Sequence, residues 1–502
     1  MKVEFPQKSI DYLRCIKSEL RRVEETQELR MPDQMPDVGR ILCCWGQVLL
    51  RSKEWHDGAM TVSGGVMAWV MYMPEGESGT GRMAQAWLPF QTKWDLPPTK
   101  HDGTIRVLPL LESVDARTTS ARKIVVRANI SLLGEAFVQD QVKVCVPDEV
   151  PGGVQLLRQT YPMVLPKEFG EKAFEMEEEL ALPQSAPPID EIFRFSFHPE
   201  LIDRKVMSGK VVFRGAGLLH ILYRSQSGEL LNWDFEIPFA QYAQLDTQFE
   251  QTAQCVVLPV VTALELDTMA DGKLFLKAGI SGQYMIYDTA LVTVAEDAYS
   301  INREMEIQTD TLHIPSAIAL ERKTLDASQT LRVQVSDVID TAFYPWLPYS
   351  RRRNDQLQIT MSGVFHVLYR DESGSLQGVS EKWQSEETMY AAENTACGLL
   401  VQASGKPTDS RVSGQTVIRG DILMDSIVTA ENQIPMICAL EVGEKQTPDP
   451  NRPNLILQRS NSLTLWELAK QNKSVMEQIR SVNDLLADAE PAPEQMLLIP
   501  VI

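Results

Sequence analysis

The feature that most constrains this chain is an internal repeat. A glycine-containing apolar run that ends in tyrosine occurs three times, and a tryptophan follows each run. The three tyrosines stand about 150 residues apart, which is enough chain for each module to bury a core of its own. The runs cover residues 62–72, 213–223 and 360–369, and the tryptophans are Trp87, Trp233 and Trp383.

A second motif recurs in the same order. Residues 123–131 match residues 273–281 closely and residues 415–423 more loosely. Apolar and polar side chains alternate along this motif, which predicts a strand with one buried face. We therefore predict a mainly β protein, built from three tandem β-rich, sandwich-like repeat modules. In the first copy the predicted buried side chains are Ile124, Val126, Ala128 and Ile130.

Local patterns predict what lies between the modules. Apolar residues from Ile10 to Val23 recur at spacings of three and four, which predicts an amphipathic helix over residues 9–29. Two Pro-rich stretches, one of them preceded by acidic residues, are typical of semi-rigid linkers. The expected order is an N-terminal helix plus the first repeat over 1–165, an acidic Pro-rich linker over 166–190, the second repeat over 191–325, the third repeat over 326–444, a linker over 445–453 and a small domain over 454–502.

The small C-terminal domain has a different pattern of apolar residues from the repeats. Residues 455–457 and 496–499 are short apolar runs, and two segments with helical spacing lie between them. The predicted order within this domain is therefore β-α-α-β.

Composition excludes several classes of function. The 502 residues are 44% hydrophobic and 23% charged, which is typical of a folded chain. A net charge of −20 disfavours nucleic acid and anionic membranes as partners. No stretch approaches the roughly 18 apolar residues of a spanning helix. Residues 1–10 carry charges and a proline where a signal peptide needs an apolar run, so we expect a chain that is not exported.

The cysteines, histidines and glycine loops of the sequence form no recognisable catalytic or metal-binding motif. Seven cysteines without a Cys-x-x-Cys pair predict free thiols in a reducing compartment, with no metal site. His220 and His366 hold the same repeat position, where the first copy has Trp69, so we interpret both as structural. No phosphate-binding loop or nucleophile motif occurs. We expect a protein that is not an enzyme and that uses no cofactor.

The C-terminal residues resemble a LysM domain. The matching residues are 464–470, 475–479, Asn483 and 495–500. The repeats, together with residues 31–42, resemble the module of unknown function that accompanies LysM in clostridial sporulation proteins. Nearly the whole chain is similar to a family of spore-coat morphogenetic proteins that dock on stage IV sporulation protein A.

The family resemblance implies a role, a place and a set of partners. It implies a noncatalytic scaffold or adaptor in spore coat assembly, located in the mother-cell cytoplasm at the forespore surface and in the spore coat. The expected partners are the morphogenetic ATPase, which the LysM domain contacts, and other coat proteins. No nucleic-acid partner and no transmembrane segment are expected.

The sequence departs from the LysM pattern at both loops that border a glycan groove. Ser462 and Leu463 stand where the family usually has Gly-Asp, and Glu494 stands where it usually has glycine. Glu494 adds bulk and charge where a sugar would lie, so we favour protein docking. Peptidoglycan or glycan binding through the LysM domain remains the alternative.

Two sets of residues are candidates for partner binding. Trp466 is expected in the core, so the LysM candidates come from its loops. A Pro-rich insertion at 343–353 in the third repeat combines aromatic residues with arginines, the composition of a binding hot spot for an acidic coat protein. In the alternative interpretation, its aromatics cover the open end of the module and its arginines are solvated. The candidates are Leu463, Thr464, Asn483, Asp488 and Pro491 in the LysM loops, and Trp346, Tyr349, Arg351, Arg352 and Arg353 in the insertion.

Overall fold

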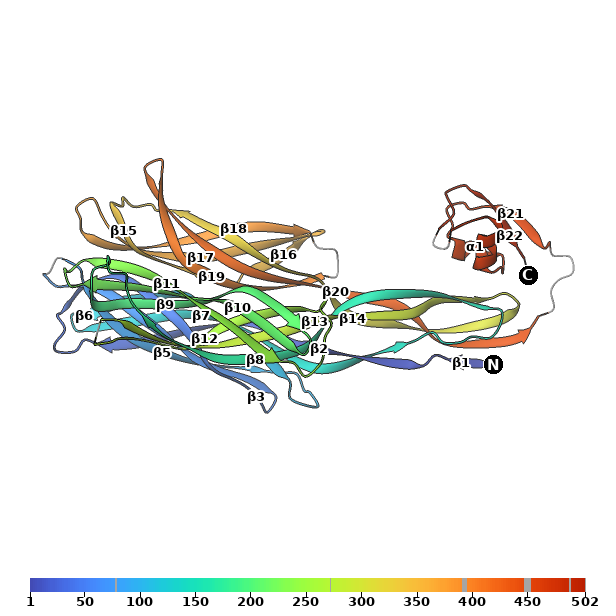
Figure 1. Ribbon diagram of the computed structural model, residues 1–502, viewed down its shortest axis with the longest axis horizontal. Coiled ribbons are helices and arrows are strands. Elements are labelled where there is room, and N and C mark those ends of the chain that lie inside the picture. Colours follow the sequence, from blue (N-terminus) through green and yellow to red (C-terminus); the bar gives the residue numbers. More distant parts are fainter. Residues whose placement is uncertain (77–78, 271, 391–394, 447–452, 487–488, 502) are drawn as a thin grey trace.

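The computed structural model is an elongated, mainly β protein, as the sequence predicts (Figure 1). It describes residues 1–76, 79–270, 272–390, 395–446, 453–486 and 489–501. Strand pairing within it is antiparallel throughout, and two short helices lie near the C-terminus. None of the helices in the described part of the chain has the length and apolar character needed to span a bilayer.

Residues 7–145, which we call the first segment, form two three-stranded sheets. The strands 59–74, 210–225 and 356–370 contain the three tyrosine-ending runs, and each lies in the middle of its sheet. In the first segment one sheet has the order β3-β4-β5 (Val38–His56, Ala59–Pro74, Arg82–Asp95) and the other the order β2-β7-β6 (Gln7–Arg30, Lys123–Cys145, Thr104–Ser120).

Residues 154–300, the second segment, have the same strand order. One sheet is β9-β10-β11 (Ile189–Met207, Lys210–Ser225, Leu230–Gln244), and β8-β13-β12 (Val154–Leu180, Leu274–Ser300, Gln254–Thr268) are neighbours in a larger sheet.

Residues 303–445, the third segment, differ from the others in one strand. Here β15 (Asp337–Pro345) and β16 (Tyr349–Arg353) pair in turn with one side of β17 (Gln356–Arg370), whose other side pairs with β18 (Leu376–Tyr390). The remaining strands are β14 (Arg303–Thr330), β20 (Gln415–Lys445) and β19 (Thr395–Val412), and β1 (Lys2–Glu4) pairs with β20.

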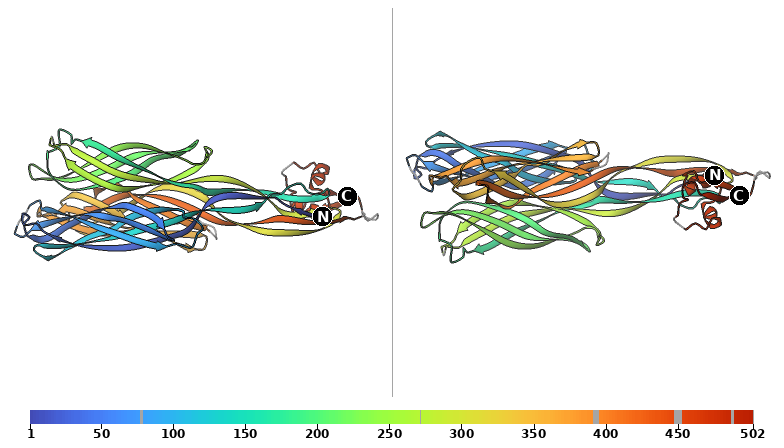
Figure 2. Two further views of the ribbon diagram at one scale, coloured as in Figure 1. Left: turned by 90° about the horizontal axis from the view of Figure 1, so that it is seen from below. Right: turned by 90° about the horizontal axis from the view of Figure 1, so that it is seen from above.

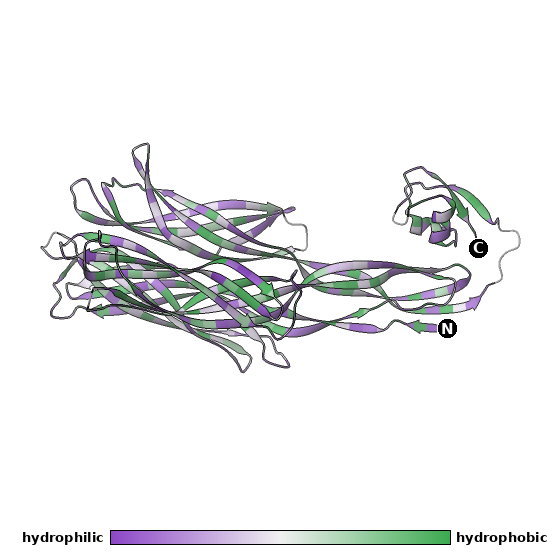
Figure 3. Ribbon diagram, in the orientation of Figure 1, coloured by the Kyte–Doolittle hydropathy of each residue, from purple (hydrophilic) through white to green (hydrophobic). Residues whose placement is uncertain are grey.

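The longest strands continue beyond the sheets as a narrow stalk (Figures 1 and 2). We define the stalk as residues 154–165 and 288–300, which pair with each other, and 303–317 and 429–445, which do the same. We call the remaining strands of the three segments the head. The core of the stalk, to which Phe5 and the adjoining ends of β2 and β7 also contribute, is separate from the main core of the head. Hydrophobic and hydrophilic residues alternate along these strands, so that one face is buried (Figure 3).

The predicted strand face in the first segment is confirmed. Ile124, Val126, Ala128 and Ile130 on β7 are fully buried, whereas Arg127 between them is exposed. The alternation of apolar and polar residues therefore predicted the buried face of this strand correctly.

The predicted N-terminal helix is wrong, because residues 7–30 form β2 and pair along their length with β7. A bulge between Cys15 and Lys17 shifts the inward and outward alternation of β2. The apolar residues of β2 also face two different cores, since Ile10 packs against the stalk core and Leu13 lies in the main core. Their spacings of three and four therefore imitate a helix.

The acidic linker predicted over 166–190 is also mostly strand. β8 continues to Leu180, and only residues 181–188 lie between strands. The acidic side chains are accommodated because lysines face them: Lys277 on β13 pairs with Glu175 and Glu177, and Lys273, just before β13, pairs with Glu179. Most of the linker predicted over 445–453, residues 447–452, lies outside the described residues.

The expectation of free thiols fails for two of the seven cysteines. Cys145 at the end of β7 and Cys438 on β20 form a disulfide, although 293 residues separate them. Nothing in the local sequence marks this pair, because the fold alone brings the two strands together. Cys15, Cys43, Cys44, Cys255 and Cys397 are free.

Removing the disulfide should loosen the joint between the first and third segments. We expect a Cys145→Ser/Cys438→Ser variant to lose about 2–4 kcal/mol of stability. Its melting temperature should be the same with and without a reductant, whereas that of the parent protein should fall on reduction. Thiol titration of the unreduced, denatured parent should count five thiols, and a count of all seven would contradict the assignment.

Candidate functional site

The C-terminal tail, residues 455–500, packs two helices on a two-stranded sheet. Its elements are β21 (Leu455–Arg459), α1 (Leu465–Gln471), α2 (Met476–Val482) and β22 (Met496–Pro500). α1 begins at Thr464, which forms a reciprocal capping box with Glu467. The core of the tail includes Leu465, Trp466, Leu468, Ile479, Leu497 and Ile499.

The predicted tail residues mostly hold the tail together. Thr464 caps α1. The Asn483 side chain donates to the carbonyl oxygens of Ile479 and Leu498 and accepts from the Leu498 N–H. Leu463 is half-buried against the tail core. Pro491 is also half-buried, and Asp488 lies outside the described residues.

Trp466 connects the tail to the stalk. Its indole N–H donates to Asp297 on β13 at 2.8 Å, and the Lys470 ammonium binds the same carboxylate at 2.6 Å. The Tyr299 ring meets the Trp466 ring edge-on, with 4.8 Å between centroids, and its hydroxyl donates to the Ser474 carbonyl. Burial raises the pKa of Tyr299 to about 12, so this hydroxyl remains a donor. The predicted core role of Trp466 thus extends beyond the tail itself.

The two tail loops that would border a glycan groove are hydrogen-bonded to each other. The Glu490 carboxylate accepts the N–H of Leu465 at 2.7 Å, and the Ser460 hydroxyl donates to the Ala492 carbonyl at 2.8 Å. Glu494 forms an ion pair with Arg459. Protein groups therefore occupy the space between the loops.

The predicted hot spot at 343–353 is divided by the fold. The Trp346 indole N–H donates to the Glu112 carbonyl of the first segment at 2.9 Å, so this ring covers a neighbour. Tyr349 is 61% exposed, and Arg351 and Arg353 are also exposed on β16. Arg352 is exposed as well and donates to the Thr395 carbonyl. The structure thus separates Trp346 from the exposed tyrosine and arginines.

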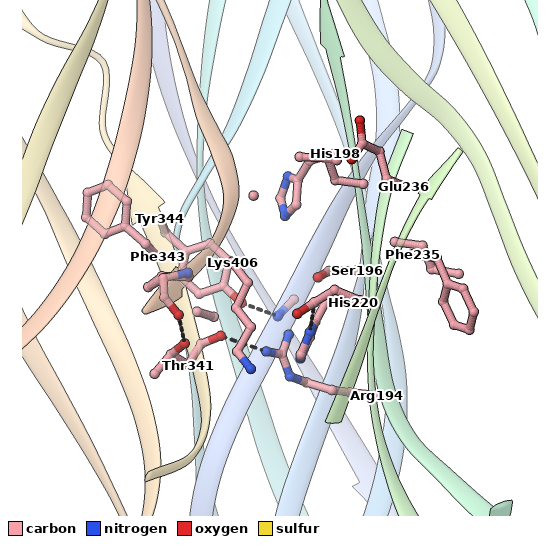
Figure 4. A pocket seen from close by; sticks show the side chains of 17 residues that line it. Arg194, Ser196, His198, His220, Phe235, Glu236, Thr341, Phe343, Tyr344 and Lys406 are labelled. Carbon is pink, nitrogen blue, oxygen red and sulfur yellow. Dashed lines mark hydrogen bonds and ion pairs between the residues drawn. The ribbon is translucent and has the colours of Figure 1, made fainter. Parts of the chain in front are cut away.

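A cavity of about 340 Å³ lies between the second and third segments, at the centre of the head (Figure 4). Strands β9, β10 and β11 form one wall, and β15 and β19 form the other. Its polar lining includes Arg194, Ser196, His198, His220, Glu236 and Lys406.

The strand registers explain why this cavity exists. Trp45 on β3 pairs with Trp69, and both rings are buried. At the corresponding positions Ser196 pairs with His220, and Ala342 pairs with His366. Each tryptophan is therefore replaced by a smaller side chain, and the missing volume leaves a hollow between β9 and β15.

A buried ionic network closes the inner end of the cavity. Arg194 Nε lies 2.5 Å from Asp340 Oδ2, and both side chains are buried. His220 bridges two carboxylates, with Nε2 at 2.8 Å from Asp340 and Nδ1 at 2.6 Å from Asp234. Burial alone would raise the pKa of Asp340, but the charges of Arg194 and His220 outweigh it and hold that pKa well below its usual range.

Three other polar groups at the cavity have no hydrogen-bond or ion-pair partner among the described residues: the Ser196 hydroxyl, the His198 imidazole and the Lys406 ammonium. Burial, followed by the charges of Arg194 and His220, lowers the pKa of His198 to about 4. His198 is therefore a neutral donor and acceptor near pH 7.

The sequence analysis did not find this cavity. The available signal was a charged residue inside an apolar strand, Arg194 within residues 192–197 and Asp340 within 338–344. Buried charges of this kind need a partner. Sequence alone does not reveal that the two residues are partners, since 146 positions separate them.

Comparisons with known proteins do not extend this description. No family model, no curated protein and no solved structure matches the chain.

The Arg194–Asp340 pair predicts an asymmetric mutational response. Asp340→Ala leaves a guanidinium buried without its carboxylate, which should cost about 3–5 kcal/mol. Arg194→Met/Asp340→Leu removes both charges and should recover most of that loss, because Cys43 is tolerated at the corresponding position of β3. Chemical denaturation measures both. Asp203→Ala, which breaks an exposed pair, should cost less than 1 kcal/mol, and an equal cost for Asp340→Ala would contradict the account.

His366 predicts a pH dependence. Burial, followed by Arg194, lowers its pKa from 6.5 to about 4. The unfolded chain then takes up a proton in this window before the folded one does, so stability should fall as the pH falls from about 6.5 to about 4. His366→Phe should reduce the loss of melting temperature between about pH 7 and about pH 5. The exposed control His56→Phe should leave that loss unchanged, and equal losses in all three proteins would exclude this role for His366.

Proposed function

We propose that this protein is a noncatalytic scaffold or adaptor in spore coat assembly. In this proposal its LysM tail docks on a coat morphogenetic ATPase of the stage IV sporulation protein A type. Its repeats present binding surfaces to other coat proteins, in the mother-cell cytoplasm and on the forespore. The family resemblance of the sequence supplies the identity of these partners, and the arrangement of exposed surfaces supports the adaptor role.

The strand arrangement supports interpreting the three segments as copies of one sandwich-like module. Each has a three-stranded group centred on a tyrosine-ending strand and a second group containing the 123–131 type of strand. The β-α-α-β order of the tail supports its interpretation as a LysM domain. Similar modules in a row offer several similar surfaces, which favours multivalent attachment.

The observation that carries the proposal is an exposed apolar sheet face on the tail. Leu455, Leu457 and Met496 are 50%, 62% and 48% exposed. The register places Leu457 opposite Leu498 and Met496 opposite Arg459, so these side chains share the outer face of β21–β22. The inner face, with Leu497 and Ile499, is already buried in the tail core. Contiguous apolar surface of this kind is typical of a protein-binding site.

The tail loops favour a protein partner over a glycan. A glycan would need the space between the loops, and there Glu490 accepts the Leu465 N–H. Glu490 also brings negative charge to that space, whereas the charge of Glu494 is paired with Arg459. The glycan-binding alternative therefore requires those loops to separate, whereas the outer sheet face is accessible as it stands.

The β16 strand supports a second surface on the third repeat. Tyr349, Arg351 and Arg353 are exposed together, and basic groups of this kind would suit an acidic coat protein. Trp346 does not belong to this surface, because it packs on the first segment.

The outer sheet face can be tested with one substitution and one matched control. Leu457→Asp should weaken binding to the purified ATPase at least tenfold, since burying a leucine contributes about 1.5–3 kcal/mol. Leu486→Asp changes a leucine that is 80% exposed but lies outside the two strands, and this variant should bind like the parent. Both variants should keep the melting temperature of the parent.

Biolayer interferometry with the immobilised ATPase measures these affinities. Unchanged binding of Leu457→Asp would remove the sheet face from the proposal. Sedimentation of the parent with peptidoglycan sacculi, but no binding to the ATPase, would favour the glycan alternative.

A further inference from the structure

We propose that the cavity between the second and third segments is a binding site for a small organic monocarboxylate. This inference is independent of the scaffold role, because it concerns the centre of the head and not the tail. A volume of about 340 Å³ lies within the range of small-molecule sites, roughly 300–1,000 Å³.

Lys406 supplies the group that selects an anion. It belongs to residues 405–407, where the pairing of β19 with β20 is interrupted between Ser404 and Thr408. Such bulges redirect side chains out of the sheet. The Thr341 hydroxyl stabilises the bulge at 405–407, because it donates a hydrogen bond to the Pro407 carbonyl at 2.6 Å. The bulge thus places an ammonium group at the cavity (Figure 4).

The charge of Lys406 is available to a ligand. Arg194 and His220 line the same cavity, but Asp340 and Asp234 already bind them. Among the described lining residues, Lys406 is therefore the cation without a carboxylate within ion-pair distance. Glu236 also lines the cavity, and its carboxylate lies at the His198 end in Figure 4. Asp234 also interacts electrostatically with Lys406 from beyond ion-pair distance, and together with Glu236 it disfavours a ligand that carries the two negative charges of a phosphate group.

The other walls indicate the rest of the ligand. Leu218, Ala342 and Tyr344 provide apolar surface for a hydrocarbon body, because they share strand faces with His220 and Asp340. The Phe235 and Phe343 rings point away from the cavity (Figure 4). Ser196 and the neutral His198 offer a donor and an acceptor that no described residue uses. The cavity therefore suits a carboxylate with a short branched or aromatic body.

Ligand-observed NMR on the full chain tests this proposal. Phenylacetate and isovalerate are the probes, and phenylacetamide is the uncharged analogue of the first. Both carboxylates should give saturation-transfer signals, and the amide should bind at least tenfold more weakly. Lys406→Met should weaken phenylacetate binding tenfold to a hundredfold, whereas Lys382→Met, at an exposed lysine of β18, should leave it unchanged.

A second variant tests the location of the site. Ser196→Trp restores the side chain that Trp45 has at the corresponding position of β3, and should abolish binding by filling the cavity. If this variant does not fold, Lys406→Met with an unchanged melting temperature decides the question alone. The proposal is overturned if neither carboxylate binds, if the amide binds equally well, or if Lys406→Met binds like the parent.

Discussion

The head of this protein depends on the contact of three inner strands, β3, β9 and β15, at its centre. The Arg194 guanidinium and the Asp340 carboxylate meet there without solvent exposure. Removing two charges from water is costly, so this pair is tolerated only because further contacts complete it. His220 binds the second carboxylate oxygen, and the Trp45 ring lies 4.9 Å from the guanidinium carbon. The pair thereby fixes the second segment against the third.

Two hydrogen bonds between neutral groups link the other pairs of segments near the same place. The Gly46 N–H donates to the Tyr344 hydroxyl, which links the first segment to the third. The Phe197 N–H donates to the Gln47 side chain, which links the second segment to the first. Each segment is therefore bonded to both others, and the cavity lies where the second segment meets the third. A ligand in that cavity would contact both the second and the third segment.

Sequence patterns predicted the strands well where burial alternates regularly. From Ile124 to Val138 on β7 every second residue is buried, and the pattern gave the correct face. On β2 a bulge at Cys15 shifts the alternation and the apolar residues face two different cores, so the same method predicted a helix. The sites were harder to predict, because their residues come from different segments. For Trp346 the sequence left two interpretations open, an exposed hot spot or a cover for the end of its module, and its partner is a carbonyl on β6, 234 positions away. The cavity needed the relative placement of β9 and β15, which no local pattern contains.

In this account the tail, fixed to the stalk through Asp297, carries the main docking surface, while the head supplies a rigid frame. Hydrogen–deuterium exchange of the full chain, with and without the ATPase, tests this division most directly. The account predicts new protection at β21 and β22 and unchanged exchange in the strands of the head. Protection confined to the head, with no change in the tail, would contradict it.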